Sequence, residues 1–284
     1  MFSIVGIVSS YYPDLDDFLK NINSYLPWID KLIIWENTPR KDSNVHTIVE
    51  QLNSDKVEVR TSGKNEYLAG PLNECISSVK DQGFSHVLTM DQDSSFAPGH
   101  FEHYRALVEN YPSKNVAAFG PNSQYRTQQN VEIGEVENIF LSGAIYPMEN
   151  LISLNGFDEE LAIDCIDTDY CYRASENNYK IMLMYGVLLN HQIGYRYKHW
   201  SGLIIAPYSA QRTYYFLRNT FWMWKKYPKY FDRPYKMSFI RYKLVYRSLK
   251  IFLEKDSIRK LRAISCALWH FKTKRLGRFD KFSK

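Results

Sequence analysis

Cysteine is scarce in this sequence and long apolar runs are missing, and these absences argue against two classes of protein. The four cysteines among 284 residues form no Cys-x-x-Cys pair and no spacing typical of zinc ligands. They indicate buried thiols in a reducing compartment rather than a disulfide framework. No run of 18 apolar residues occurs, so no transmembrane helix is expected. The first eight residues have strand character and lack the basic and apolar regions of a signal peptide.

Positive charge is concentrated at the C-terminal end. Residues 236–284 contain 15 Lys and Arg against 3 Asp and Glu, a net charge of +12, and because the whole chain carries +5, residues 1–235 carry −7. Such a basic segment attracts polyanions, either lipid headgroups or nucleic acid. Apolar side chains lie among these cations, namely Trp269, Phe271, Leu276 and Phe279. This mixture is typical of an anionic membrane interface; a solvated tail or a protein contact is the alternative.

Strand-like and helix-like segments alternate through the first half of the chain. The hydrophobic pattern predicts strands at 4–8, 31–35, 57–60, 86–90 and 116–119. It predicts helices at 14–25, 44–53, 71–82 and 99–109. This alternation predicts an α/β fold, with a mostly parallel sheet flanked by helices.

The second half is less regular. Residues 121–138 are polar and predict an excursion, and Ile139–Tyr146 is expected to resume as a strand. Helices are predicted for Ser209–Tyr227 and within Tyr235–Phe271. Two prolines at 228 and 234 favour a boundary there, so we expect a main domain at 1–228 and a basic helical extension at 229–284.

Two carboxylates follow the apolar run that ends at Met90, as Asp91-Gln92-Asp93. On an extended backbone, residues i and i+2 point the same way, so Asp91 and Asp93 are expected to converge just past a strand end. Converging carboxylates repel unless a cation lies between them, and hard oxygen ligands favour Mg²⁺, Mn²⁺ or Ca²⁺. Ligands of open α/β sheets bind beyond the carboxyl ends of strands. A metal that binds a diphosphate is one interpretation; a polar turn is the other.

A second acidic cluster places six acids within residues 158–169, among apolar residues that favour burial. A partly buried carboxylate can be tuned as a base. We expect Thr168 to cap a helix that includes Arg173. Asp167 would then stand just before that helix, at the edge of a pocket. Helix capping alone is the alternative role for Asp167.

Three basic or imidazole side chains complete the candidate set. His191 follows the apolar run Val187–Leu189, where it can join the metal site or serve as a hydrogen-bonded turn residue. Arg212 and Arg218 share one predicted helix, and an Arg near a diphosphate neutralises it in bidentate fashion. The alternative is that one of the two is only a surface charge.

Together these motifs resemble family 2 of the inverting glycosyltransferases, which have the GT-A fold, and most of all the bacterial rhamnosyltransferase branch. The motifs that carry the resemblance are Ile4–Asp14, Leu88–Ser94, Ser142-Gly143, Gly156–Glu159, Ile163–Arg173, His191–Gly194 and Arg212–Asn219. Their order and spacing agree over roughly residues 2–225. Three positions depart from the family: Glu36 lies in an unusual Trp-Glu-Asn-Thr run, Tyr67 stands where glycine is common, and Ile166 replaces an acid.

The resemblance implies roles for individual residues. Asp93 would coordinate Mg²⁺ or Mn²⁺, with Asp91 assisting or touching the ribose and His191 as a further ligand. Asp167 would be the base that deprotonates the acceptor hydroxyl. The residues implied to bind substrate are Glu36, Asn73, Asp91, Ser142, Gly143, Asp164, Asp169, Arg212 and Arg218.

The sequence therefore predicts an inverting transfer of a sugar from a nucleotide diphosphate to a hydroxyl of a cell-surface glycan or its lipid-linked precursor. dTDP-L-rhamnose is the expected donor, and a UDP-hexose is the alternative. A metal-dependent phosphohydrolase or a catalytically silent nucleotide-sugar-binding protein would use the same acids. We expect the protein in the cytoplasm, peripheral on the inner face of the cell membrane through its basic tail, with no nucleic acid partner.

Overall fold

The computed structural model describes residues 2–123, 131–191, 197–198, 204–205, 208–254 and 256–282. The chain divides into two compact units. The first comprises Met1–Phe157 and Asp167–Gln192, and the second comprises Asp158–Ile166 and Ile193–Lys284. Within the described residues, no helix is long and apolar enough to cross a membrane.

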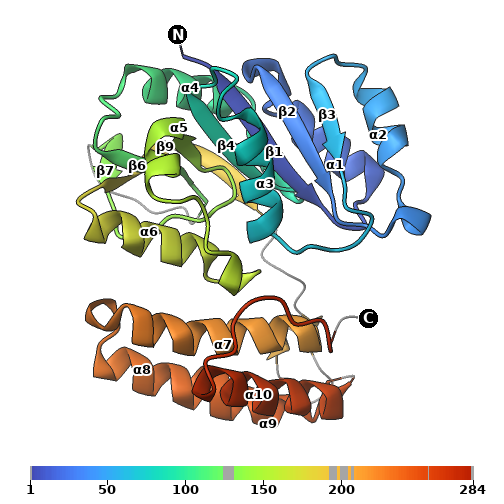
Figure 1. Cartoon of the computed structure of the whole chain (residues 1–284), viewed down its shortest axis with the longest axis vertical. Helices are drawn as coiled ribbons and strands as arrows, with labels where there is room; N and C mark the ends of the chain where they lie inside the picture. The colour runs from blue at the N-terminus through green and yellow to red at the C-terminus, as the bar shows by residue number, and fades with distance from the viewer. Residues whose placement is uncertain are drawn as a thin grey trace. The chain divides into compact units, whose positions relative to one another are not determined.

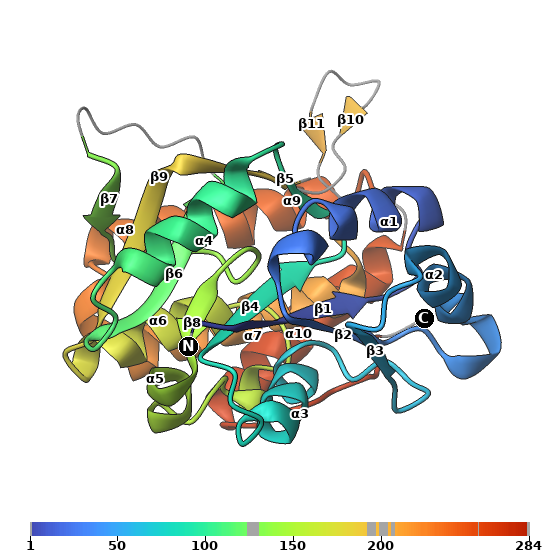
Figure 2. The same ribbon diagram turned by 90° about the horizontal axis from the view of Figure 1, so that it is seen from above.

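The first unit is built on a mixed sheet whose parallel part comes first in the sequence (Figure 2). Its parallel strands lie in the order β3 (Val57–Arg60), β2 (Lys31–Glu36), β1 (Ile4–Ser10) and β4 (His86–Asp91). β1 and β2 are buried almost throughout and rich in Ile and Val, as is usual for strands covered on both faces. The predicted strands at these four positions and the predicted α/β fold are confirmed.

Helices cover both faces of this sheet (Figure 2). α1 (Leu15–Asn23), α2 (Val45–Leu52) and α4 (His100–Asn110) lie on one face, and α3 (Ala69–Val79) and α5 (Met148–Ser153) on the other. Asp14 caps α1 by accepting a hydrogen bond from the Asp17 amide. Phe18, Ile48 and Tyr104 are buried where three of these helices meet the sheet core.

The remaining strands are built around β9 (Lys180–His191). β9 runs parallel to β6 (Val116–Asn122) and antiparallel to β5 (Ser94–Phe96) and β7 (Ile133–Glu135), while β8 (Ile145–Pro147) joins β4 to β6. In the β5–β9 pair, Ser94 lies opposite His191. This register brings the ends of β4 and β9 together.

Two expectations about local structure are wrong. Of the strand expected at Ile139–Tyr146, only residues 145 and 146 form one, at the start of β8. Residues 139–144 are not a strand, and the chain turns at Ser142-Gly143, where Gly143 has a φ of +81° and its amide donates to the Thr89 carbonyl at 2.8 Å. The excursion at 121–138 is also more ordered than expected, since β6 extends to Asn122 and β7 lies within it. The part of that excursion at 124–130 is outside the described residues.

The second unit is helical. It contains α7 (Ala210–Lys226), α8 (Arg233–Phe239), a π-helical segment (Ile240–Tyr246), α9 (Arg247–Ile251) and α10 (Ser257–Lys272), together with short strands β10 (Tyr197–Lys198) and β11 (Ile204–Ile205). Figure 1 shows α7, α8 and α10 side by side. Ser209 caps α7 through the Arg212 amide, and Asp232 caps α8 through the Tyr235 amide.

The helix predicted for Ser209–Tyr227 is confirmed, and the helical stretch after Tyr235 is interrupted between α9 and α10. Among the described residues, the 3₁₀ turns are Leu26–Trp28, Arg40–Asp42, Glu159–Leu161 and Pro228–Tyr230. α7 packs against α10 within this unit. The predicted domain boundary after residue 228 stays a prediction, and the compact units divide the chain at other positions.

Candidate metal and donor site

The ends of β4 and β9 bring three candidate metal ligands together. Ligand atoms of Asp91, Asp93 and His191 all lie within 4.8 Å of one another. The cause is not the extended backbone that the sequence predicted, because Gln92 and Asp93 form a turn between β4 and β5. That turn folds the chain back so that β5 pairs with β9, and the pairing delivers His191 to the two carboxylates.

A chain of hydroxyl groups positions His191. The Asp91 amide donates to Ser142 Oγ at 3.1 Å, and Ser142 Oγ donates to Ser94 Oγ at 2.8 Å. Ser94 Oγ lies 2.7 Å from His191 Nδ1, and the Phe140 ring stacks on the imidazole. Ser94 is fully buried. Sequence reasoning gave Ser94 no role, although its place directly after Asp93 was the available signal.

The donor set fits a hard or borderline divalent cation. Carboxylates suit Mg²⁺ and Mn²⁺, and an imidazole ligand favours a transition metal such as Mn²⁺. His191 lies beside Asp93, with Nδ1 3.7 Å from Asp93 Oδ1. Because Nδ1 is hydrogen-bonded to Ser94, Nε2 is the nitrogen that the imidazole can offer to an ion. The Asp93 side chain is 47% exposed. Its exposure leaves room on the solvent side for the oxygens of a diphosphate.

The turn at Ser142-Gly143 requires glycine. A Cβ on Gly143 would lie 2.6 Å from Pro121 Cγ and 3.0 Å from Leu189 Cδ2, and the φ of +81° strains other residues. This turn sets the position of Ser142, whose hydroxyl joins Asp91 to Ser94. The roles predicted for Ser142 and Gly143 in binding substrate stay predictions; the structure places both beside the metal ligands.

Asp167 lies in the first turn of α6 (Ile166–Glu176) and is half-buried. Burial raises the pKa of its carboxyl above the ordinary value, while hydrogen bonds from Thr168 and a backbone hydrogen bond with Leu141 oppose the rise. The Thr168 amide lies 2.8 Å from Asp167 Oδ1. The expectation that Thr168 caps the helix is wrong, since α6 begins before it. A carboxyl with a raised pKa suits a base.

The 139–143 turn therefore connects the two candidate centres within the first unit. Its Leu141 is a hydrogen-bonding partner of Asp167, and its carbonyl accepts from Thr89 Oγ1 on β4. Its Ser142 binds the Asp91 amide. One short turn thus contacts both the predicted base and the predicted metal site.

Asp169 has a different environment. It is fully buried, and its Oδ2 lies 3.2 Å from Arg173 Nη2 one turn along α6. Arg173 also donates to the carbonyls of Leu154 and Gly156. This pair fixes the chain after α5, so the structure gives Asp169 a supporting position. Its predicted contact with a sugar hydroxyl stays a prediction.

Glu36 and Asn73 also hold backbone in place. Glu36 ends β2 and is buried; it accepts from the Thr38 amide at 2.8 Å and from Ser43 Oγ at 3.2 Å. Asn73 exchanges hydrogen bonds of 2.8 and 2.9 Å with the Phe157 backbone. Parallel register places the ends of β2, β1 and β4 at one sheet edge, so Glu36 and Asp91 share that edge. Their predicted contacts with a nucleotide stay predictions.

In the second unit, α7 holds the acidic segment before α6. Arg218 is fully buried and donates to the carbonyls of Gly277 at 2.6 Å and Glu160 at 2.9 Å. Asn219, to which the sequence gave no role, donates to three carbonyls from Leu161 to Asp164. The guanidinium of Arg218 is thus already bonded to protein groups, and its predicted contact with substrate stays untested.

Arg212 differs from Arg218 although both lie on α7. Its side chain is 57% exposed, and its Nη2 lies 3.4 Å from Asp164 Oδ1. Asp164 has a φ of +64°, which is uncommon for a residue other than glycine. The pair brings together two residues that the sequence predicted to bind substrate, and that binding stays a prediction.

Comparisons with known proteins agree with this fold. No protein-family model matches the sequence. The chain is similar to dTDP-rhamnosyl transferase RfbF of Shigella flexneri, with 22% identity over 245 residues that cover 79% of this chain and 80% of that protein. Two solved structures are also similar, one of GalNAc-T7 and one of TarS from S. aureus.

The GalNAc-T7 structure, with UDP, GalNAc and Mn²⁺, gives a TM-score of 0.58 at 10% identity, over 77% of this chain and 47% of that chain. The TarS 1-349 structure, in complex with UDP-GlcNAc, gives 0.53 at 14% identity, over 95% of this chain and 73% of that chain. These findings confirm the GT-A fold. The predicted resemblance to a bacterial rhamnosyltransferase is confirmed by the similarity to RfbF.

Proposed function

We propose that this protein is a metal-dependent inverting glycosyltransferase that uses dTDP-L-rhamnose. The convergence of Asp91, Asp93 and His191 at one sheet edge carries the proposal. The similarity to a dTDP-rhamnosyl transferase supports the reaction and the sugar. The Mn²⁺ in the GalNAc-T7 structure supports a divalent ion.

Each step of the transfer has a group in the first unit suited to it. Asp91, Asp93 and His191 would hold the ion, which neutralises the charge that develops on the leaving diphosphate. Asp167 accepts the proton of the acceptor hydroxyl. The acceptor oxygen bonds to the anomeric carbon as the bond from that carbon to the diphosphate breaks, so a single displacement inverts the centre. No enzyme nucleophile is needed.

A UDP-hexose is the second candidate donor. Both structural neighbours were solved with UDP or a UDP-sugar, which favours this reading. A hydrophobic pocket that accepts the 6-methyl group of rhamnose rejects an added hydroxyl only weakly. The acceptor we propose is a glycan or lipid-linked glycan of the cell surface.

We also propose that the protein is peripheral on the cytoplasmic side of an anionic membrane, through different residues from those the sequence indicated. Phe271 packs on Phe221 with ring centroids 5.6 Å apart, and Phe279 packs on Tyr214 at 4.8 Å, so neither is free to enter a bilayer. Trp269 is exposed. Further exposed apolar side chains lie on the segment from α8 to the start of α10, namely Met237, Tyr242, Val245, Leu249, Phe252 and Ile258.

A donor panel tests the reaction. Calorimetry and product analysis with dTDP-L-rhamnose, UDP-glucose, UDP-galactose and UDP-GlcNAc, each with and without Mn²⁺, should show metal-dependent binding and inverting transfer for the rhamnose donor. Asp93→Asn should remove the metal-dependent part of binding while the melting temperature of the free protein is kept. Turnover of a UDP-hexose alone would refute the rhamnose donor. Binding without turnover would favour a silent binding protein, and phosphate release without transfer would favour a phosphohydrolase.

A further inference from the structure

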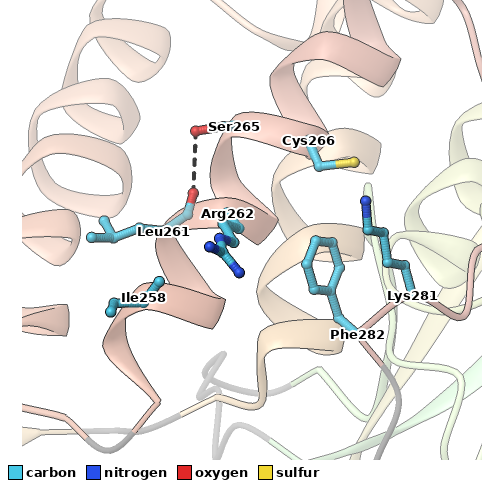
Figure 3. A pocket seen from close by; sticks show the side chains of 7 residues that line it. All are labelled: Ile258, Leu261, Arg262, Ser265, Cys266, Lys281 and Phe282. Carbon is cyan, nitrogen blue, oxygen red and sulfur yellow. Dashed lines mark hydrogen bonds between the residues drawn. The ribbon is translucent and has the colours of Figure 1, made fainter.

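A hollow of about 430 Å³ lies in the second unit, beside α10 (Figure 3). One stripe of α10 lines it, at Ile258, Leu261, Arg262, Ser265 and Cys266. This spacing of three and four residues is one helix face. Ile258 is 68% exposed. An apolar helix face would normally be covered, and here it borders open space.

The far wall comes from the segment after α10, which supplies Lys281 and Phe282 (Figure 3). This wall is fixed by hydrogen bonds on both sides. The Phe282 amide donates to Gln211 Oε1 at 3.0 Å, and Arg259 Nη2 donates to the Phe282 carbonyl at 2.9 Å. Gln211 also donates to the Phe279 carbonyl. The hollow is therefore formed before any ligand arrives.

The charge on the lining is positive and uncompensated. Over the described part of the chain, neither Arg262 nor Lys281 forms an ion pair with an acidic side chain, while Asp280 is paired with Arg278 at 2.7 Å. Glu254 is paired with Lys260 at 2.6 Å. No acidic side chain is among the residues that line the hollow, so its two cations have no acidic partner within the lining.

We propose that this hollow binds an anionic amphiphile, with a phosphate or carboxylate head on an aliphatic chain. The head would lie at Arg262 and Lys281, and the chain against Ile258, Leu261 and Phe282. A free anion would leave the apolar wall in water, and a neutral apolar ligand would leave two cations unpaired. The volume lies in the range of about 300–1,000 Å³ that is usual for small-molecule sites. The site is independent of the proposed reaction, since its residues all belong to the second unit.

Titration with octyl phosphate, below its micelle concentration, tests the proposal by calorimetry on the full chain. Inorganic phosphate and octyl glucoside are the comparison ligands. Octyl phosphate should bind at least about tenfold more tightly than either, which corresponds to about 1.4 kcal/mol. Equal affinity for octyl glucoside, or for inorganic phosphate, would overturn the requirement for both parts of the ligand.

Cys266 reports where the ligand binds. It is half-buried in the lining, and octyl phosphate should slow its modification by N-ethylmaleimide several-fold. Cys165 is similarly half-buried and outside the lining, so its rate, followed by mass spectrometry of the same sample, should not change. Protection of both cysteines, or of neither, would contradict the assignment. Protection by anionic vesicles would identify the source as a membrane lipid, and protection by octyl phosphate alone a soluble amphiphile.

Three variants separate the site from a general effect of charge. Arg262→Gln and Lys281→Gln should each weaken octyl phosphate binding about tenfold. Lys272→Gln, an exposed position of α10 outside the lining, should leave it unchanged. Ser265→Trp should fill the hollow and abolish binding. If Lys272→Gln weakens binding as much as Lys281→Gln does, the attraction is a property of the basic segment and the site is refuted.

Discussion

At the residue scale, the carboxyl of Asp167 combines burial with a position suited to proton transfer. Burial raises its pKa, and the carboxylate is the form that can take a proton from the acceptor. Asp167→Asn keeps the shape and removes the basicity. We expect donor binding to remain near the wild-type value while transfer falls by about 10²-fold or more. Calorimetry with the donor and initial rates at saturating donor measure the two effects separately.

The pH dependence provides the control for Asp167. Because its folded pKa is raised, transfer should fall as the pH is lowered through that pKa, where the carboxyl becomes protonated. The free energy of unfolding changes in the opposite direction. The protonated carboxyl favours the folded state at low pH, and this contribution is lost as the pH rises through the folded pKa. Asp167→Asn should therefore gain stability relative to wild type as pH rises, measured by urea denaturation. If Asp164→Asn loses transfer while Asp167→Asn keeps normal rates, Asp167 is not the base.

The position of Ser94 leads to a prediction about metal affinity. Its hydroxyl holds His191 Nδ1 at 2.7 Å, and groups that orient a metal-binding imidazole typically contribute 10–100-fold to affinity. We expect Ser94→Ala to weaken Mn²⁺ binding by about 10-fold. Ser95→Ala is the matched control, because adjacent residues of a strand face opposite sides. Mn²⁺ affinity followed by electron paramagnetic resonance decides this, and equal affinities in the two variants would exclude a role for Ser94.

These residues show what spacing alone predicts. Asp91 and Asp93 do converge with His191, but through a turn and a strand pairing between distant segments. The link through Ser94 depends on the same long-range register, which no local pattern of residues specifies. The buried bonds of Glu36 and Asn73 are likewise tertiary contacts. Sequence reasoning therefore found the charged groups of the site and named Ser142 and Gly143, but it gave no role to Ser94, which holds His191.

At the scale of elements, the turn between Ile139 and Ala144 was predicted as a strand because its residues are apolar. The positive φ of Gly143 overrides that preference. We expect Gly143→Ala to destabilise the protein by about 1–3 kcal/mol, because the left-handed backbone and the close approach of Pro121 both oppose a Cβ. It should also weaken metal binding by displacing Ser142. Urea denaturation and Mn²⁺ titration measure these effects.

Gly186→Ala is the control for Gly143. Gly186 lies in β9, and a Cβ there would meet no atom within 4 Å. Its substitution should change stability by less than about 1 kcal/mol and leave metal binding intact. Similar effects of the two substitutions would show that the turn does not depend on glycine at 143.

We expect substitutions of the two arginines of helix α7 to have different effects on stability. Arg218→Met leaves buried carbonyls without their donor and should cost about 3 kcal/mol or more. Arg212→Met breaks one pair in which Arg212 is 57% exposed and Asp164 is 12% exposed, and it should cost less than Arg218→Met, about 1 kcal/mol. If Arg212 binds the donor as predicted, Arg212→Met lowers transfer at unchanged melting temperature. A stable Arg218→Met protein would contradict the structural position given to Arg218.

At the scale of the whole molecule, the α/β unit could be predicted because each of its strands and helices has its own local pattern. Which segments form the second unit could not be predicted from the sequence. Residues Asp158–Ile166 belong to this unit because Arg218 and Asn219 form hydrogen bonds to them. Those bonds join segments more than 50 residues apart. The charge asymmetry could be counted from the sequence, whereas the identity of the exposed apolar residues required the packing of Phe271 and Phe279 to be known.

Because Phe271 and Phe279 are packed against the protein, we expect other exposed apolar residues to contact the membrane. Leu249 and Phe252 are 62% and 65% exposed, and Lys250 lies between them in the sequence. Exposed apolar residues beside Lys and Arg favour an anionic bilayer surface, where each cation contributes about 1 kcal/mol. Substituting both Leu249→Glu and Phe252→Glu should therefore reduce flotation with phosphatidylglycerol vesicles several-fold. Raising the salt concentration should weaken binding of the wild type, because screening shortens the reach of its charges.

Ile152→Glu provides the matched control, as an exposed apolar position of α5 in the first unit. It adds one negative charge, against two in the double variant, at a position of the first unit, and should float like the wild type. Vesicles of phosphatidylcholine alone should recover little protein, since they lack the anionic surface. Equal recovery of the Leu249/Phe252 double variant and the wild type would mean that these exposed side chains do not enter the bilayer. The apolar residues between α8 and α10 would then need another partner, with the basic charge acting elsewhere.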